Sequence, residues 1–344
     1  RETGLWYYPY KERGNIMSHL LEVEGLTTVF TGDYGETTSV DHVSFHVDEG
    51  EVVCIVGESG CGKSVTNLSV MGLLSRGGKV TEGKVLFEDR DLLAMSEKEL
   101  DKIRGDRMTM IFQDPLTSLN PVFTVGNQIM ESLQIHRGLS RNEAGIQAEE
   151  LLSKVGMPDA KGTMKKYPHT LSGGMRQRAM IAMALSCKPK LLIADEPTTA
   201  LDVTIQAQIM QLLKELQKEN KMAMILITHD IGLVAHMADR VIVMYAGQII
   251  EEAPVRELFR HPKHPYTRAL MDTVPTIRDT AERQLKAIPG IVPESYDHIP
   301  GCRFADRCSY RRPECDKPQE NYEFGGGHMA RCIVRKEGGI QDES

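Results

Sequence analysis

The sequence has 344 residues, of which 41% are hydrophobic and 26% are charged, with a formal net charge of -7. This is globular composition, which excludes a wholly disordered or collagen-like chain, and the negative charge argues against sequence-independent binding of nucleic acid. No apolar run approaches the roughly 18 residues of a membrane-spanning helix, so we expect no membrane-embedded segment.

Residues 1–16 show no periodic pattern, and we interpret them as a leader or tag outside the folded domains. From Met17 to about Ala253, short apolar segments alternate with helical patterns, which predicts an α/β domain with a buried parallel sheet. The predicted strands are Val52–Val56, Met108–Phe112, Leu191–Ala194, Met224–Thr228 and Arg240–Tyr245.

The stretch from about 115 to 185 lacks strand patterns and predicts a helical subdomain, with one helix at Glu143–Val155. A further helix is predicted at Ile205–Leu216. Residues 254–344 hold nine of the sixteen prolines, which predicts a loop-rich C-terminal extension with too few apolar residues for a large core of its own.

A phosphate-binding motif follows the first predicted strand and precedes a helical pattern. The motif G-x-x-x-x-G-K-[ST] is matched by Gly57-Glu58-Ser59-Gly60-Cys61-Gly62-Lys63-Ser64. Its glycines allow backbone N–H groups to surround a polyphosphate, and the following helix, with Val65 in its first turn, adds a positive dipole end. Lys63 would pair with the β- and γ-phosphates, and the Ser64 hydroxyl could bind Mg²⁺.

Two acidic residues end the strand that begins at Leu191. Asp195 is placed where a carboxylate can hold Mg²⁺, and Glu196 is placed to polarise an attacking water. A second anion-binding pattern is Leu171-Ser172-Gly173-Gly174, where Ser172 is a good helix N-cap before a helix expected from Met175.

Together these motifs resemble the ATP-binding subunits of ABC transporters from about Leu20 to Ala253. The resemblance implies a P-loop ABC-type nucleotide-binding domain, with a RecA-like core, an antiparallel β portion and a helical subdomain. The matching motifs are Walker A (Gly57–Ser64), the Q-loop (Gln113), the signature (Leu171–Gln177), Walker B (Leu191–Glu196), the D-loop (Ala200-Leu201-Asp202) and the H-loop (His229).

The resemblance also implies roles for these residues. Two ATP sites would form between head-to-tail subunits, with Ser172, Gly173 and Gly174 serving the γ-phosphate held by the partner chain and Asp202 at the interface. Glu196 would activate water, His229 would orient it, and Gln113 would sense the γ-phosphate and Mg²⁺. Tyr34 corresponds to the aromatic residue that stacks on adenine, with Phe30 as a rival.

The C-terminal extension contains Cys302, Cys308, Cys315 and Cys332 within 31 residues. We see no secretory signal, so we expect a cytosolic setting, where such a cluster indicates metal rather than disulfides. The wide spacing favours an iron–sulfur cluster over zinc, although His298 and His328 leave a mixed Cys/His zinc site open. Four nearby arginines, Arg303, Arg307, Arg311 and Arg312, could offset a cluster's negative charge or form a solvated face.

The other cysteines are interpreted within the ATPase domain. Cys54 is expected in the core and Cys187 buried at a helix end. Cys61 occupies a variable position of the phosphate-binding motif, where oxidation could impair ATP binding.

Residues Pro262–Thr267, followed by the four cysteines, resemble the C-terminal extension of oligopeptide/dipeptide importer ATPases. The resemblance implies a [4Fe–4S] cluster, with Zn²⁺ as the alternative. It also implies a peripheral subunit at the cytoplasmic face of the cell membrane. The partners would be a second ATPase subunit, two transmembrane permeases and, indirectly, an extracytoplasmic peptide-binding protein.

Two other functions stay open at this point. One is an ABC ATPase that acts on ribosomes, nucleic acid or iron–sulfur assembly, which the single cassette and the net charge of -7 disfavour. The other is a non-hydrolysing structural subunit, which the intact Glu196 and His229 disfavour. Among importers, nickel complexes are an alternative cargo to peptides.

Overall fold

The computed structural model describes residues 19–32, 35–114, 118–199, 201–273, 288–293 and 296–338. The chain forms two compact units, which are described separately. Unit 1 contains the residues up to 47, residues 52–93 and the residues from 228 onward, and unit 2 contains residues 48–51 and 94–227. The segment 1–16, Tyr34, Pro115 and Ala200 lie outside the described residues.

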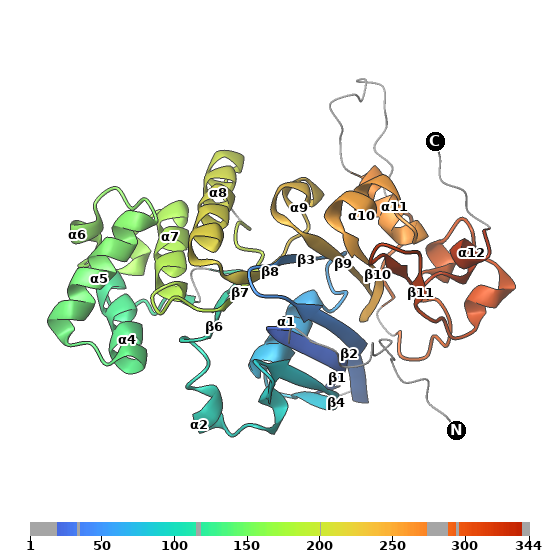
Figure 1. Cartoon of the computed structure of the whole chain (residues 1–344), viewed down its shortest axis with the longest axis horizontal. Helices are drawn as coiled ribbons and strands as arrows, with labels where there is room; N and C mark the ends of the chain where they lie inside the picture. The colour runs from blue at the N-terminus through green and yellow to red at the C-terminus, as the bar shows by residue number, and fades with distance from the viewer. Residues whose placement is uncertain are drawn as a thin grey trace. The chain divides into compact units, whose positions relative to one another are not determined.

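An antiparallel sheet in unit 1 contains the first strands of the chain (Figure 1). Its order is β2-β1-β4-β5, and its strands are β1 (Leu21–Gly32), β2 (Gly35–Val47), β4 (Gly78–Phe87) and β5 (Arg90–Asp91). Leu21 on β1 pairs with Val47 on β2 and with Phe87 on β4. These three side chains are fully or almost fully buried, so one face of this sheet forms a core.

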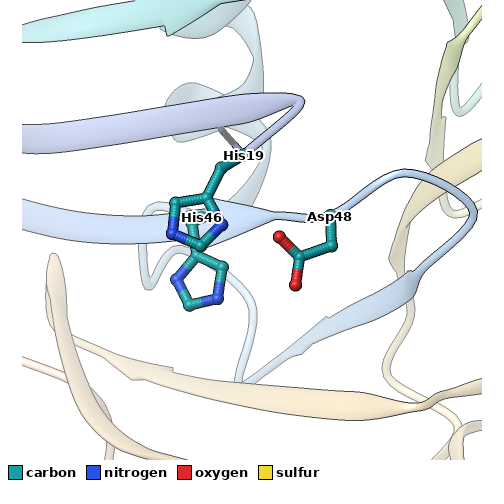
Figure 2. A group of neighbouring side chains, drawn as sticks. All are labelled: His19, His46 and Asp48. Carbon is teal, nitrogen blue, oxygen red and sulfur yellow. The ribbon is translucent and has the colours of Figure 1, made fainter. Parts of the chain in front are cut away.

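The start of this sheet also brings two histidines together. The ring centroids of His19, just before β1, and His46, on β2, lie 4.0 Å apart (Figure 2). Asp48, drawn with them in Figure 2, belongs to unit 2.

A second set of strands in unit 1 joins the C-terminal extension to the α/β domain. Their order is β11-β12-β10-β9-β3, and β3 is parallel to β9. The strands are β3 (Val52–Val56), β9 (Arg240–Tyr245), β10 (Gln248–Pro254), β11 (Tyr322–Glu323) and β12 (Met329–Ala330). Because β12 pairs with β10, residues beyond 320 continue this sheet.

Helices and short 3₁₀ turns complete the described part of unit 1. The helices are α1 (Lys63–Met71), α9 (Ile231–Met237), α10 (Val255–Arg260), α11 (Pro265–Asp272) and α12 (Ile333–Lys336), and the turns are η3 (Ala305–Arg307) and η4 (Pro313–Asp316). The turn η1 (Leu92–Ala94) stands where unit 1 passes into unit 2.

Unit 2 combines parallel strands with helices. Its strands β6 (Met108–Ile111), β7 (Leu191–Asp195) and β8 (Ala223–Ile227) are parallel, in the order β8-β7-β6. Its helices and 3₁₀ turn are α2 (Glu97–Leu100), α4 (Val125–Arg137), α5 (Arg141–Lys154), α6 (Ala160–Thr163), η2 (Pro168–Thr170), α7 (Gly173–Ala184) and α8 (Val203–Asn220). Helices α4 to α7 gather together (Figure 1).

The predicted elements are confirmed, with shifts at their ends. Two strands, Val52–Val56 and Arg240–Tyr245, have the predicted bounds. The strand predicted to reach Phe112 ends at Ile111, and Phe112 is 37% exposed. From 118 to 185 the described residues contain no strand, as predicted for the helical subdomain. Among the helices of the described residues, none has both the length and the apolar character needed to cross a membrane.

Two residues of α4 test the packing of the helices in unit 2. Leu133 is 0% exposed, whereas Ile135 is 69% exposed. We expect Leu133→Ala to lower the free energy of unfolding by about 2–5 kcal/mol, because it leaves a cavity. Ile135→Ala should change it by less than about 0.5 kcal/mol. Urea unfolding of both variants measures the difference, and equal shifts of the two midpoints would contradict this packing.

Candidate functional site

The predicted phosphate-binding loop connects β3 to α1 within unit 1. Lys63 begins α1 and is only 6% exposed, and its ammonium donates hydrogen bonds to the carbonyls of Gly57 (2.8 Å) and Glu58 (2.9 Å). Gly57 has φ 153°, and a Cβ there would lie 2.3 Å from the carbonyl oxygen of Met244. Glycine is therefore required at this position, since a side chain would collide with backbone.

The other residues of the loop differ in exposure. Ser59 and Gly60 are exposed, Gly62 is buried, and Ser64 and Val65 are half-buried on α1. Cys61 is 0% exposed, and burial raises the pKa of its thiol. The expectation that oxidation of Cys61 impairs ATP binding therefore loses its basis, because an inaccessible, protonated thiol reacts poorly.

Two residues of the C-terminal extension contact this loop, and the sequence analysis missed both contacts. The Tyr266 hydroxyl accepts a hydrogen bond from the backbone N–H of Glu58 (2.8 Å). Arg307 donates to the Glu58 carboxylate through both terminal nitrogens, at 2.7 and 3.0 Å. Tyr266 belongs to the family-like segment Pro262–Thr267, and Arg307 lies between two of the clustered cysteines. Both residues belong to segments that the sequence singles out, but nothing in the sequence indicates that their partner is Glu58.

In unit 2, the carboxyl ends of β6 and β7 bring two predicted residues together. Gln113 follows β6, and its side-chain amide donates a hydrogen bond to the Glu196 carboxylate (2.9 Å). The same carboxylate oxygen accepts from the hydroxyl of Thr199 (2.9 Å), a contact that sequence reasoning missed. Asp195, at the end of β7, is 5% exposed. Parallel strands place their carboxyl ends at one sheet edge, which explains why these groups meet.

The backbone at Glu196 is unusual. Its φ is 43°, in the left-handed region that residues with side chains seldom adopt. Its N–H donates to the carbonyl of Ile227 on β8 (3.0 Å), which fixes this conformation at the end of the strand. Such backbone strain is often found at functional sites, and here it directs the carboxylate toward Gln113 and Thr199.

The predicted anion site at Ser172 is a helix N-terminus in unit 2. The Ser172 side chain accepts a hydrogen bond from the N–H of Met175, which confirms the predicted cap. The helix begins at Gly173 rather than at Met175, because the two glycines form its first turn. A Cβ on Gly174 would lie 2.9 Å from Cγ2 of Ile205 on α8, so close packing restricts this position to glycine.

The remaining predicted residues are distributed between the two units. Asp202 is the N-cap of α8, where its carboxylate accepts from the N–H of Ile205 (3.0 Å). His229 is an exposed residue that follows β8. Phe30, the rival of Tyr34, is half-buried on β1 and lies against Gly78. Tyr34 itself lies outside the described residues.

Three of the four clustered cysteines lie in or against the small core of the extension. Cys315 and Cys332 are buried with Ala305 and Val334, and Cys302 packs against them. Burial, with smaller contributions from the neighbouring cysteines, raises the pKa of Cys302 to about 12. The N–H of Tyr310 donates to the sulfur of Cys308 (3.4 Å).

The four arginines near these cysteines form ion pairs. Each is paired with a carboxylate: Arg303 with Asp41, Arg307 with Glu58, Arg311 with Asp306 and Asp316, and Arg312 with Glu337.

The two histidines considered for a mixed Cys/His zinc site differ in burial. His328 is buried and hydrogen-bonds to Glu251 (2.7 Å), which occupies its Nε2. His298 is exposed.

Two protein-family models match this chain, one before residue 200 and one in the C-terminal extension. Residues 40–199 match the model of the family described as ABC transporter. Residues 250–315 match the model described as oligopeptide/dipeptide transporter, C-terminal region. The second match includes Cys302, Cys308 and Cys315.

Similar proteins match the chain over nearly its whole length. It is 51% identical to the oligopeptide transport ATP-binding protein AppD of Bacillus subtilis, over 94% of this chain and 99% of that protein. It is 49% identical to the dipeptide transport ATP-binding protein DppD of Escherichia coli, over 91% of this chain and 96% of that protein.

A solved structure supports the same assignment. The ATP-binding cassette MJ0796, in a dimeric post-hydrolysis state bound to ADP and Pi, matches with a TM-score of 0.62 and 31% identity. The match covers 69% of this chain and 99% of that cassette. The chain therefore belongs to the ABC transporter ATPases, in the group of oligopeptide and dipeptide transport ATP-binding proteins.

Proposed function

We propose that this chain binds and hydrolyses ATP to power the import of peptides through a membrane transporter. The phosphate-binding loop, with Lys63 held by two loop carbonyls, carries the ATPase assignment. The peptide cargo is supported by the near full-length similarity to oligopeptide and dipeptide transport proteins. This similarity favours peptides over nickel complexes and an importer over an ATPase of ribosomes, nucleic acid or iron–sulfur assembly.

In this proposal, the loop amides and Lys63 bind the phosphates of ATP. The residues assigned to nucleotide binding are Gly57, Ser59, Gly60, Cys61, Gly62, Lys63, Ser64 and Val65, with Tyr34 stacking on adenine. Ser64, Asp195 and Gln113 would bind Mg²⁺, which neutralises charge on the phosphates. Hydroxyl, carboxylate and amide oxygens suit this cation, and Asp195 is buried at a strand end where its carboxylate is held in place.

Hydrolysis needs a water molecule directed at the γ-phosphate. We assign Glu196 as the group that polarises this water and His229 as the group that orients it. The hydrogen bonds from Gln113 and Thr199 fix the Glu196 carboxylate, and a fixed orientation lowers the entropic part of the barrier. Gln113 would thereby link the catalytic carboxylate to the helical subdomain.

The ATPase would act as a dimer with permease subunits. Ser172, Gly173 and Gly174 would bind the γ-phosphate of ATP on a second ATPase subunit, and Asp202 would lie at that interface. The exposed N-terminus of α7 is compatible with this role. We place the subunit at the cytoplasmic face of the membrane, where an extracytoplasmic peptide-binding protein would deliver cargo to the permeases.

The corresponding domain boundaries are 17–253 for the nucleotide-binding domain and 254–344 for the extension. The helical subdomain would cover about 115–185. These boundaries are supported by the positions of the elements, because β10 ends at Pro254 and helices α4 to α7 fall between 125 and 184.

We further propose that Cys302, Cys308, Cys315 and Cys332 hold a [4Fe–4S] cluster. Three of these thiols share one small core, and the N–H donor to the fourth, Cys308, fits such a group. The wide spacing of these cysteines in the sequence favours the cluster over zinc.

The catalytic assignment predicts the effect of Glu196→Gln. We expect ATP turnover to fall at least about 100-fold, because the amide cannot polarise water, while ATP binding persists. Glu219→Gln is the control, since Glu219 forms a surface ion pair with Lys154 in the same unit. Phosphate release and nucleotide titration measure the two properties. Turnover by Glu196→Gln at the wild-type rate would contradict the assignment.

The cluster assignment predicts the metal content of the protein. Prepared without oxygen, it should be brown and contain about four iron and four sulfide ions per chain. Cys315→Ala should lose most of this iron, whereas Cys187→Ser should retain it, because Cys187 lies in unit 2. Elemental analysis that finds one zinc per chain and no iron would show that the zinc alternative is right.

A further inference from the structure

Every polar group of Glu58, inside the phosphate-binding loop, has a partner. Its N–H donates to Tyr266, its carbonyl accepts from Lys63, and its carboxylate accepts two hydrogen bonds from Arg307. Lys63 belongs to the loop itself, but Tyr266 and Arg307 come from the residues beyond 253. The C-terminal extension therefore contacts the loop through both the backbone and the side chain of one residue.

Arg307 is itself held by several groups of unit 1. Its Nε donates to the carbonyl of Pro289 (2.7 Å), and a terminal nitrogen donates to the hydroxyl of Tyr245 (3.2 Å). The side chain is only 7% exposed, and its hydrogen bonds to Glu58 raise its pKa, so it remains charged. A guanidinium fixed in this way presents both nitrogens to a carboxylate in a bidentate arrangement.

Tyr266 is fixed by an aromatic cluster. Its ring lies 4.7 Å from the ring of Tyr245 and 5.3 Å from that of Phe304, between ring centroids. Tyr245 and Tyr266 are 0% exposed and Phe304 is 3% exposed. Phe304 and Arg307 both lie between Cys302 and Cys308, so one short segment supplies the packing and the ion pair.

The charge of Glu58 makes these contacts matter for nucleotide binding. ATP brings several negative charges to the loop, and an unpaired carboxylate there would repel them. The Glu58 carboxylate is 29% exposed, which places it where solvent and ligand can approach. Pairing with Arg307 cancels its charge, and the bond to Tyr266 fixes the backbone at the same residue.

We propose that Arg307 and Tyr266 of the C-terminal extension position the phosphate-binding loop and neutralise Glu58, so that Arg307 is a positioning residue for ATP binding. This inference rests on the proposed function of the loop Gly57–Ser64 in binding ATP. It assigns to the extension a role in the ATPase reaction in addition to any role of its cysteines.

The test is titration of the full chain with ATP, together with steady-state hydrolysis. Arg307→Ala should weaken ATP binding about tenfold and raise KM by a similar factor, while kcat at saturating ATP stays within about twofold. Adding Glu58→Gln to Arg307→Ala should restore most of the affinity, because it removes the repelling charge. Arg311→Ala is the matched control and should bind ATP as the wild type does, since among the described residues Arg311 pairs with Asp306 and Asp316 of the extension itself.

Unchanged affinity in Arg307→Ala would overturn the proposal. So would a loss that Glu58→Gln fails to restore, because this would indicate a purely structural ion pair. If Arg307→Ala does not fold, Arg307→Gln keeps hydrogen-bond donors without the charge and should show the same loss. A wild-type chain that does not bind ATP would instead contradict the proposed function of the loop, and this outcome is separate from the comparison between variants.

Discussion

The fixed conformation of the phosphate-binding loop is the constraint on which the site in unit 1 depends. The ammonium of Lys63 crosses the loop to the carbonyls of Gly57 and Glu58, and backbone packs directly against Gly57. Contacts within the chain thus fix the conformation of the loop. A preformed set of donors costs little reorganisation when charge must be stabilised, which is the main requirement of phosphoryl transfer.

The same principle applies to the residues of unit 2 that we propose to be catalytic. Glu196 has a left-handed backbone conformation, and its carboxylate is held by Gln113 and Thr199. The backbone strain is unfavourable for stability, whereas the two hydrogen bonds hold the carboxylate in one orientation. Both direct one carboxylate, which is what the proposed role of Glu196 in polarising water requires. The proposed role in hydrolysis therefore accounts for the backbone conformation and the carboxylate orientation of Glu196, which packing alone does not explain.

Many of the strands, helices and site residues could be predicted from the sequence. The contacts that could not be predicted were missed for a physical reason. The strand Val52–Val56 and the Ser172 cap can be predicted because both depend on residues that are neighbours in the sequence. The contacts of Glu58 with Tyr266 and Arg307 cannot be read this way, because they join residues more than 200 positions apart. Arg307 was interpreted with the nearby cysteines, since sequence proximity was the only guide to its partner.

The central claim is that the loop Gly57–Ser64 binds the phosphates of ATP through Lys63. The most direct measurement compares ATP binding by Lys63→Ala with that of Lys79→Ala, an exposed lysine on β4 of the same unit. The account predicts that Lys63→Ala weakens ATP binding by at least about tenfold, because a charge-assisted contact to phosphate is lost, and that Lys79→Ala binds as the wild type does. Equal affinities of Lys63→Ala and the wild type would contradict it.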